Sequence, residues 1–130
     1  MTVTPIDLFA TFVQLDQGGR ARAKEPEFDH AGEGWQVMTF HAATDADVHG
    51  DHWEVHPHAE EVVSCLAGGI RLYFRPERAG EPEEEVALPA GSAVIVPRGR
   101  WHRIALDAPS DLMSVTVPRG SRLEPRAPRG

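Results

Sequence analysis

Short apolar runs, each four to eight residues long, recur along the chain between turn residues. Helical spacing, with apolar residues at every third or fourth position, is scarce, whereas Val, Ile, Leu and aromatic residues cluster between Gly and Pro. The pattern predicts nine β-strands, at residues 8–15, 35–41, 52–56, 61–66, 70–75, 85–88, 93–96, 101–106 and 112–117. An all-β sandwich or barrel follows, because closing a sheet removes exposed strand edges.

One glycine pair predicts how two of these strands are connected. Gly68 and Gly69 separate the runs 61–66 and 70–75, and glycine readily adopts the positive φ angles of a two-residue hairpin loop. We therefore expect these two strands to pair with each other.

Two segments lack the strand pattern. Residues 17–34 contain glycines and alternating charges with few apolar residues, which predicts a long connecting loop that covers a cavity mouth or is mobile. Residues 118–130 carry four arginines and three prolines but a single leucine, which predicts a basic, Pro-rich C-terminal tail. Residues 1–117 then form a single domain.

Composition narrows the range of partners. The chain has 130 residues, 41% hydrophobic and 25% charged, and its net charge of −7 argues against nucleic acid or an anionic membrane. The one cysteine, Cys65, cannot form an internal disulfide and lies in an apolar run, which predicts a small buried side chain. No apolar run approaches the roughly 20 residues of a membrane span. We expect a cytoplasmic protein that binds a small molecule.

Histidines and carboxylates supply the candidate chemistry. Four of the seven histidines lie between residues 49 and 58. Because side chains two apart in a strand share a face, His52, Glu54 and His56 point the same way. Imidazole nitrogen and carboxylate oxygen are ligands that divalent metals such as Zn, Fe, Mn, Ni or Cu accept. An exposed His-rich turn without metal is the alternative.

The stretch GSAVIVPRGRWHRIAL carries a recognisable motif. It matches the pattern G-x5-P-x-G-x2-H-x3-N from Gly91 through Pro97 and Gly99 to His102, with Leu106 in place of the final Asn. Here the sequence resembles the cupin superfamily, which implies a double-stranded β-helix, or jelly-roll, barrel with a metal site inside. The resemblance covers residues 35–117, and it implies that His102 faces the barrel interior.

The first cupin motif, G-x5-H-x-H-x3,4-E-x6-G, aligns in two ways with GDHWEVHPHAEEVVSCLAGG. Alignment on Gly50 makes His56 and His58 the histidine pair, but then only two residues separate His58 from Glu61.

Alignment on Gly68 leaves the required six residues between Glu61 and the glycine, and it puts His56 at the second histidine position. Glu54 then stands where the first histidine is expected. We favour this alignment. The resemblance thus implies a metal site made by His56, Glu61, His102 and Glu54, with His58 as the alternative fourth ligand.

The string WEVHPHAEEVV resembles, more narrowly, small single-domain bacterial cupins with a Trp-Glu-x-His-Pro signature. The resemblance implies one divalent metal ion, which is Fe, Mn, Zn or Ni. It also implies that the protein binds a small organic molecule or acts on it, either as a dioxygenase or as a lyase or isomerase that uses the metal as a Lewis acid. Glu54 or Glu61, if displaced from the metal, would then serve as base. A homodimer is also implied, with residues 8–15 crossing between subunits.

Two other functions stay open. One is a non-catalytic cupin that binds or senses a small molecule, with or without metal. If Glu54 pairs with Arg71 or Arg103, the metal has three ligands and binds weakly, or is absent. A structural dimerisation domain follows if side chains fill the barrel interior.

Aromatic and methionine side chains are assigned less specifically. Trp53 and Trp101 each precede a proposed ligand in the chain, and we expect them to pack or to line the rim of the cavity. Four further residues line either a cavity or the core, and periodicity does not choose between the two: Met38, Phe40, Tyr73 and Met113.

Overall fold

The computed structural model describes residues 3–27 and 33–126. Their secondary structure is eleven β-strands and one short 3₁₀ helix, η1 (Asp45–Val48). No helix in these two ranges is long and apolar enough to cross a membrane. The strands are β1 (Phe12–Asp16), β2 (Arg20–Lys24), β3 (Trp35–Ala42), β4 (His52–Val55), β5 (Glu61–Ala67), β6 (Gly69–Phe74), β7 (Glu84–Pro89), β8 (Ser92–Val96), β9 (His102–Leu106), β10 (Ser110–Thr116) and β11 (Arg122–Pro125).

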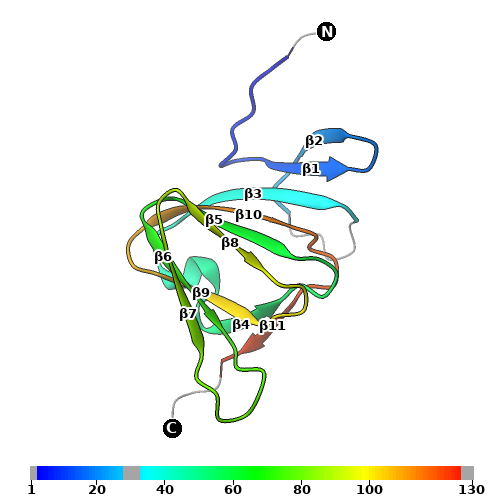
Figure 1. Cartoon of the computed structure of the whole chain (residues 1–130). Coiled ribbons are helices and arrows are strands. Elements are labelled where there is room, and N and C mark those ends of the chain that lie inside the picture. The colour runs from blue at the N-terminus through cyan, green and yellow to red at the C-terminus, as the bar shows by residue number, and fades with distance from the viewer. Residues whose placement is uncertain (1–2, 28–32, 127–130) are drawn as a thin grey trace.

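The strands form two antiparallel sheets that face each other (Figure 1). One sheet has the order β2-β1-β3-β10-β5-β8, and the other has the order β11-β4-β9-β6-β7. From β3 onward the chain passes repeatedly from one sheet to the other, which is the winding of a double-stranded β-helix. The prediction of an all-β jelly-roll barrel is confirmed.

Strand alternation sends every second side chain into the barrel, and the interior has two unlike ends. The β6 side chains Ile70, Leu72 and Phe74 are at most 4% exposed and lie in the core cluster. Along β9, which pairs with β6, the inward positions change from Leu106 beside Ile70 to His102 beside Phe74. One end of the barrel is therefore filled by apolar side chains, and the other end holds polar ones.

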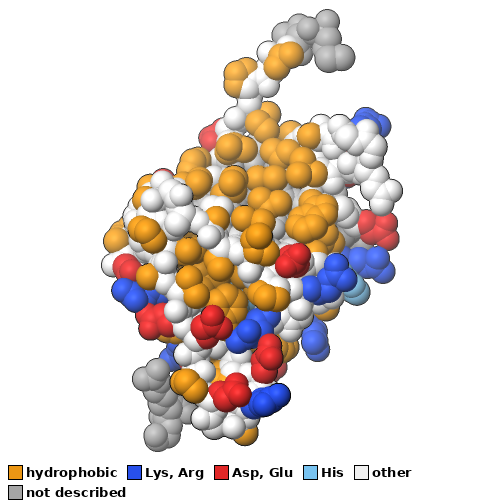
Figure 2. Space-filling view, viewed as in Figure 1, with side chains coloured by type: hydrophobic (Ala, Val, Ile, Leu, Met, Phe, Trp, Pro, Cys, Tyr) orange, Lys and Arg blue, Asp and Glu red, His pale blue; other side chains and the backbone are white. Residues whose placement is uncertain are grey.

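The outer face of the six-stranded sheet is also apolar. One row of β-branched side chains crosses five strands in register, in the order Val13, Val37, Val115, Val62 and Ile95. Figure 2 shows apolar side chains gathered over β1, β3, β5 and β8 on this side of the molecule. We call this surface the apolar face.

The glycine pair does not form the predicted hairpin. β5 and β6 belong to different sheets, so the expectation that they pair is wrong. Only Gly68 has a positive φ, +87°, while Gly69 starts β6. A Cβ on Gly68 would collide with the Ser110 hydroxyl and the Pro109 carbonyl, so glycine is required by backbone conformation and by close approach.

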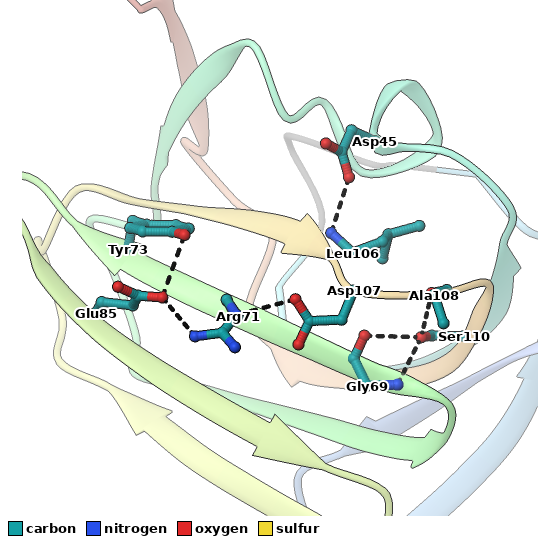
Figure 3. Close-up of polar contacts among 9 residues, drawn as sticks. All are labelled: Asp45, Gly69, Arg71, Tyr73, Glu85, Leu106, Asp107, Ala108 and Ser110. Atoms are coloured by element: carbon teal, nitrogen blue, oxygen red, sulfur yellow. Dashed lines mark hydrogen bonds and ion pairs between the residues drawn. The ribbon is translucent and has the colours of Figure 1, made fainter.

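Polar contacts around Gly69 and Ser110 hold the turn between β5 and β6 in place (Figure 3). The buried Ser110 hydroxyl accepts a hydrogen bond from the Gly69 amide at 3.1 Å and donates to the Ala108 carbonyl at 2.8 Å. On the outer surface Arg71 pairs with Glu85 at 2.6 Å and with Asp107 at 2.9 Å. These outer ion pairs are partly exposed and contribute little to stability, whereas the buried Ser110 contacts hold the turn.

The N-terminal predictions need correction. β1 starts at Phe12 rather than residue 8. Residues 20–24 of the predicted loop form β2, which pairs with β1 across a turn in which Gly18 and Gly19 both have positive φ. Alternating charges hid this strand, because an exposed edge strand needs no apolar face. Residues 28–32 of the predicted loop lie outside the described ranges.

The C-terminal segment also differs from the prediction. Within the expected tail, Arg122–Pro125 form β11, which pairs with β4 along its whole length. The strand is stabilised by backbone hydrogen bonds and by an ion pair of Glu124 with Arg75 at 3.0 Å, rather than by apolar burial. A search for apolar runs therefore could not detect it.

Two glycines with the same φ of +87°, Gly68 and Gly91, allow the cost of close approach to be measured. A Cβ added to Gly91 would meet no atom within 4 Å. We expect Gly91→Ala to lower the free energy of unfolding by about 1–2 kcal/mol, the cost of a left-handed residue. In Gly68→Ala the new Cβ also overpacks its surroundings, so this variant should lower the free energy of unfolding by roughly 3–5 kcal/mol, measured by urea unfolding. Equal losses would contradict this account of Gly68.

Candidate metal centre

Three strands bring the candidate ligands together at the polar end of the barrel. Glu54 lies in β4 and is the register partner of His102 at the start of β9. His56 follows the end of β4, where its carbonyl accepts a hydrogen bond from the Gly99 amide at 3.0 Å. Glu61 begins β5 in the opposite sheet. The site therefore spans both sheets.

The ligand atoms of these four side chains converge on one point. All of them lie within 4.8 Å of one another. The Glu61 Oε1 atom is 3.0 Å from His102 Nε2 and 3.3 Å from His56 Nε2, and Glu54 Oε1 is 3.8 Å and 3.3 Å from the same two nitrogens. Ligands around one tetrahedral ion at about 2.0–2.2 Å are separated by roughly 3.4 Å, so the spacing suits a shared ion.

Three of the four ligand atoms are buried without a hydrogen-bond partner among the described residues: His56 Nε2, Glu61 Oε1 and His102 Nε2. The residues that carry them are at most 5% exposed. Buried polar atoms normally find a partner, because leaving one unsatisfied costs about 1–3 kcal/mol. Three such atoms that face one another fit a cation held among them.

The electrostatics of the cluster are dominated by the two carboxylates. Burial alone lowers the pKa of His56, but Glu54 and Glu61 outweigh it and raise that pKa to about 10. The pKa of His102 is raised for the same reason, chiefly by Glu61 against its burial. Burial would raise the pKa of Glu61, but the two imidazoles hold it well below its usual range. The cluster thus favours a positive charge at its centre.

Each fully buried ligand has a second contact that orients it. The Nδ1 atom of His56 lies 2.6 Å from the Ser121 hydroxyl, and Nδ1 of His102 lies 3.0 Å from the Arg100 carbonyl. The Ser114 hydroxyl donates a hydrogen bond to Glu61 Oε2. Sequence reasoning missed both serines. For Ser114 the signal was its alternation with Leu112 in a buried strand, whereas Ser121 lay in the expected tail.

The other candidate ligands lie elsewhere. His58, the alternative fourth ligand, is exposed and is not part of the cluster. His52 contacts Asp51 at 2.7 Å instead. The alternative in which Glu54 pairs with an arginine is not seen, because Arg71 pairs with Glu85 and Asp107, and Arg103 pairs with Glu83.

The aromatic and methionine candidates divide between the two faces of the sheets. Met38 and Phe40 face the barrel interior, beside the inward Ser114 and Leu112 of β10. Met113 lies on the opposite face of β10 and therefore faces away from the barrel interior.

The remaining aromatic candidates lie on the outer face of the second sheet. The Arg103 guanidinium stacks 4.0 Å from the centre of the Tyr73 ring and 5.4 Å from that of Trp53. The Trp101 ring lies under Arg75 and Arg122. Both tryptophans pack against arginine side chains, which is one of the two roles expected for them, and Tyr73 faces away from the barrel interior.

The donor set fits a borderline divalent metal. Two imidazoles and two carboxylates match the preferences of Fe, Mn and Zn, and they disfavour soft ions that require thiolate. Cys65, the only thiol of the chain, is fully buried in the apolar core cluster, as its sequence position predicts.

No protein-family model and no curated protein matches the sequence. Among solved structures, the chain is similar to an uncharacterized conserved protein with a double-stranded beta-helix domain from Klebsiella pneumoniae subsp. pneumoniae MGH 78578, at 20% identity, 71% coverage of this chain and 70% of that chain, and a TM-score of 0.52. A cupin superfamily protein from Desulfitobacterium hafniense DCB-2 matches at 17% identity, 66% and 69% coverage, and a TM-score of 0.51.

Fe(II) HppE matches at 18% identity and a TM-score of 0.50, over 63% of this chain and 42% of that longer one. These comparisons do not show the narrower group of cupins with the Trp-Glu-x-His-Pro signature. Together with the two-sheet topology, they show that the chain has the double-stranded β-helix fold of the cupin superfamily.

Proposed function

We propose that this protein holds one divalent metal ion in its barrel and acts there on a small organic molecule. The ligands are Glu54, His56, Glu61 and His102, and the ion is Fe, Mn, Zn or Ni. The observation that carries the proposal is the set of three buried, converging ligand atoms without hydrogen bonds. The similar fold of HppE, whose structure is described as an Fe(II) form, supports the proposal.

The four ligands have different roles in this proposal. His56 and His102 provide neutral nitrogen donors, and the buried Glu61 is fixed by Ser114. A metal ion bound here would polarise a carbonyl or enolate oxygen, or activate dioxygen. The Glu54 side chain is 29% exposed, against 6% for Glu61. A small molecule would therefore approach on the Glu54 side, and the Glu54 carboxylate, once displaced from the metal ion, would accept its proton.

A cytoplasmic location stays a prediction from the sequence, based on its single cysteine and on the lack of an apolar run as long as a membrane span. A second copy of the chain is the partner we propose. The apolar face offers a continuous β-branched row, in which Ile95 is 61% exposed. The segment before β1 exposes Ile6, Leu8 and Phe9 and extends away from the barrel (Figure 1). Association of two such faces would remove both apolar surfaces from water.

Metal content tests the ligand set. Protein purified without a histidine tag should carry close to one equivalent of a divalent metal, measured by elemental analysis. His56→Ala and His102→Ala should each reduce the content at least tenfold, because a buried ligand is lost. His58→Ala is the matched control and should keep the wild-type content. Loss of metal in His58→Ala alone, or full content in both ligand variants, would contradict the assignment.

Metal removal should destabilise the protein. At a free metal concentration 100 times the Kd, binding stabilises the folded state by about 2.7 kcal/mol. For a domain of this size we expect chelation to lower Tm by roughly 10 °C in a calorimetric scan. His102→Ala should show no such shift. Metal-free wild-type protein with an unchanged Tm would favour the binding or sensing module instead.

Oligomeric state tests the apolar face. With one chain at 14.3 kDa, a dimer should appear at 2 × 14.3 = 28.6 kDa in light scattering. Ile95→Arg should give a monomer, because it places a charge in the interface. Leu123→Arg, at a 46% exposed position on the other sheet, should remain dimeric. A monomeric wild-type protein, or a dimer that survives Ile95→Arg, would refute this interface.

A further inference from the structure

The segment between β10 and β11 contributes a side chain to the candidate metal centre. It leads from one sheet to the other, and β11 then lies along β4 at the edge of the second sheet (Figure 1). We infer that Ser121 is a positioning residue that orients His56 for the metal ion, so that metal affinity depends on the C-terminal strand. This inference rests on the proposed function.

The geometry around His56 defines what Ser121 does. The Nε2 atom points at Glu54 and Glu61, at 3.3 Å from each. If Nε2 binds the ion, the proton of the neutral ring must be on Nδ1. The Ser121 hydroxyl, 2.6 Å away, then accepts that proton as a hydrogen bond. The contact fixes both the tautomer and the rotation of the ring.

Both partners of this contact are buried, so the hydrogen bond is shielded from water. His56 is 3% exposed and Ser121 is 7% exposed. A buried hydrogen bond of this kind cannot readily be replaced by solvent when the hydroxyl is removed. The Nδ1 atom would lose its acceptor, and the ring would lose its orientation.

Backbone structure sets Ser121 opposite His56. β11 pairs with β4 so that Arg122 faces Val55, which brings the residue before β11 beside the residue after Val55. A turn leads into the strand, with the Ser121 amide donating to the Pro118 carbonyl at 3.0 Å. Gly120 in this turn has φ +71°, and a Cβ there would lie 3.0 Å from the His58 ring. The turn is therefore both left-handed and closely packed.

The rest of β11 is anchored on both sides. Glu124 pairs with Arg75 at 3.0 Å, and the Arg122 guanidinium lies 5.5 Å from the centre of the Trp101 ring. Beyond the strand, the Arg126 amide donates to the Asp51 carbonyl at 2.9 Å. These contacts hold Ser121 in place even though the segment contains little apolar surface.

The orienting contacts of the other two buried ligands do not come from the C-terminal segment. His102 is oriented by the carbonyl of Arg100, two residues away, which no side-chain substitution removes. Glu61 is oriented by Ser114 within the paired strands β5 and β10. His56 alone among the three takes its orienting contact from a segment 65 residues later in the chain.

The test compares metal affinity in variants that keep or lose the hydroxyl. Affinity for Co²⁺ and Zn²⁺ is measured by competition with a chromophoric chelator, using the full chain. Ser121→Ala should raise the Kd for both ions by about 10–100-fold, the usual cost of losing such an orienting contact. Ser92→Ala removes a hydroxyl whose hydrogen bond goes to the Pro89 carbonyl rather than to a proposed ligand, and it should leave the Kd unchanged.

A second pair separates the hydroxyl from packing. Ser121→Thr and Ser121→Val introduce side chains of nearly the same shape, and only Thr keeps the hydroxyl. We expect the Thr variant to bind Co²⁺ at least tenfold more tightly than the Val variant, with both shown to be folded by circular dichroism.

The outcomes separate this inference from the proposed function. Equal affinity in Ser121→Ala and wild type, or in the Thr and Val variants, would overturn the role of Ser121 and leave the metal site standing. A wild-type protein that binds neither ion would overturn both.

Discussion

The structure depends on placing four polar side chains, the candidate metal ligands, inside a barrel whose other end is apolar. The register of β4 against β9 sets Glu54 beside His102, and the opposite sheet brings Glu61 to within 3.0 Å of the same imidazole. Burying these groups is unfavourable unless their charges are compensated. The mutual attraction of imidazoles and carboxylates provides part of the compensation, and a divalent ion at their centre would complete it.

The apolar end of the barrel makes this arrangement possible. Ile70 and Leu72 are completely buried, and they lie on the same strand as Phe74, which packs next to His102 in the register of β6 and β9. Hydrophobic burial at one end thus fixes the strand register that aims the ligands at the other end. The pairing of β6 with β9 therefore contributes both to the apolar core and to the position of His102.

Much of this could be predicted from the sequence. Alternation within apolar runs located the strands from β3 to β10 within a few residues, and the spacing from Gly91 to His102 indicated an inward imidazole. Three of the four converging side chains, Glu54, His56 and Glu61, are those expected from the alignment on Gly68, and the fourth, His102, is the histidine of the second motif. Local pattern sufficed here because each strand has one buried face and the motif fixes the turns between strands.

The failures have a common physical cause. β2 and β11 are edge strands held by backbone pairing and charged side chains, so they carry no apolar signal. The partner of β5 could not be inferred from Gly68, because a tight turn can link two strands of one sheet or of two. Ser121 could not be recognised from the sequence because it precedes β11, which has no apolar pattern. Long-range pairing decides these features, and local composition does not.

Anomalous diffraction from crystals grown with a divalent metal tests the central claim most directly. The account predicts one strong peak at the metal's absorption edge, about 2.0–2.2 Å from the Nε2 atoms of His56 and His102 and from a Glu61 oxygen. Imidazole rings that face solvent, or a centre without an anomalous peak at saturating metal, would contradict it.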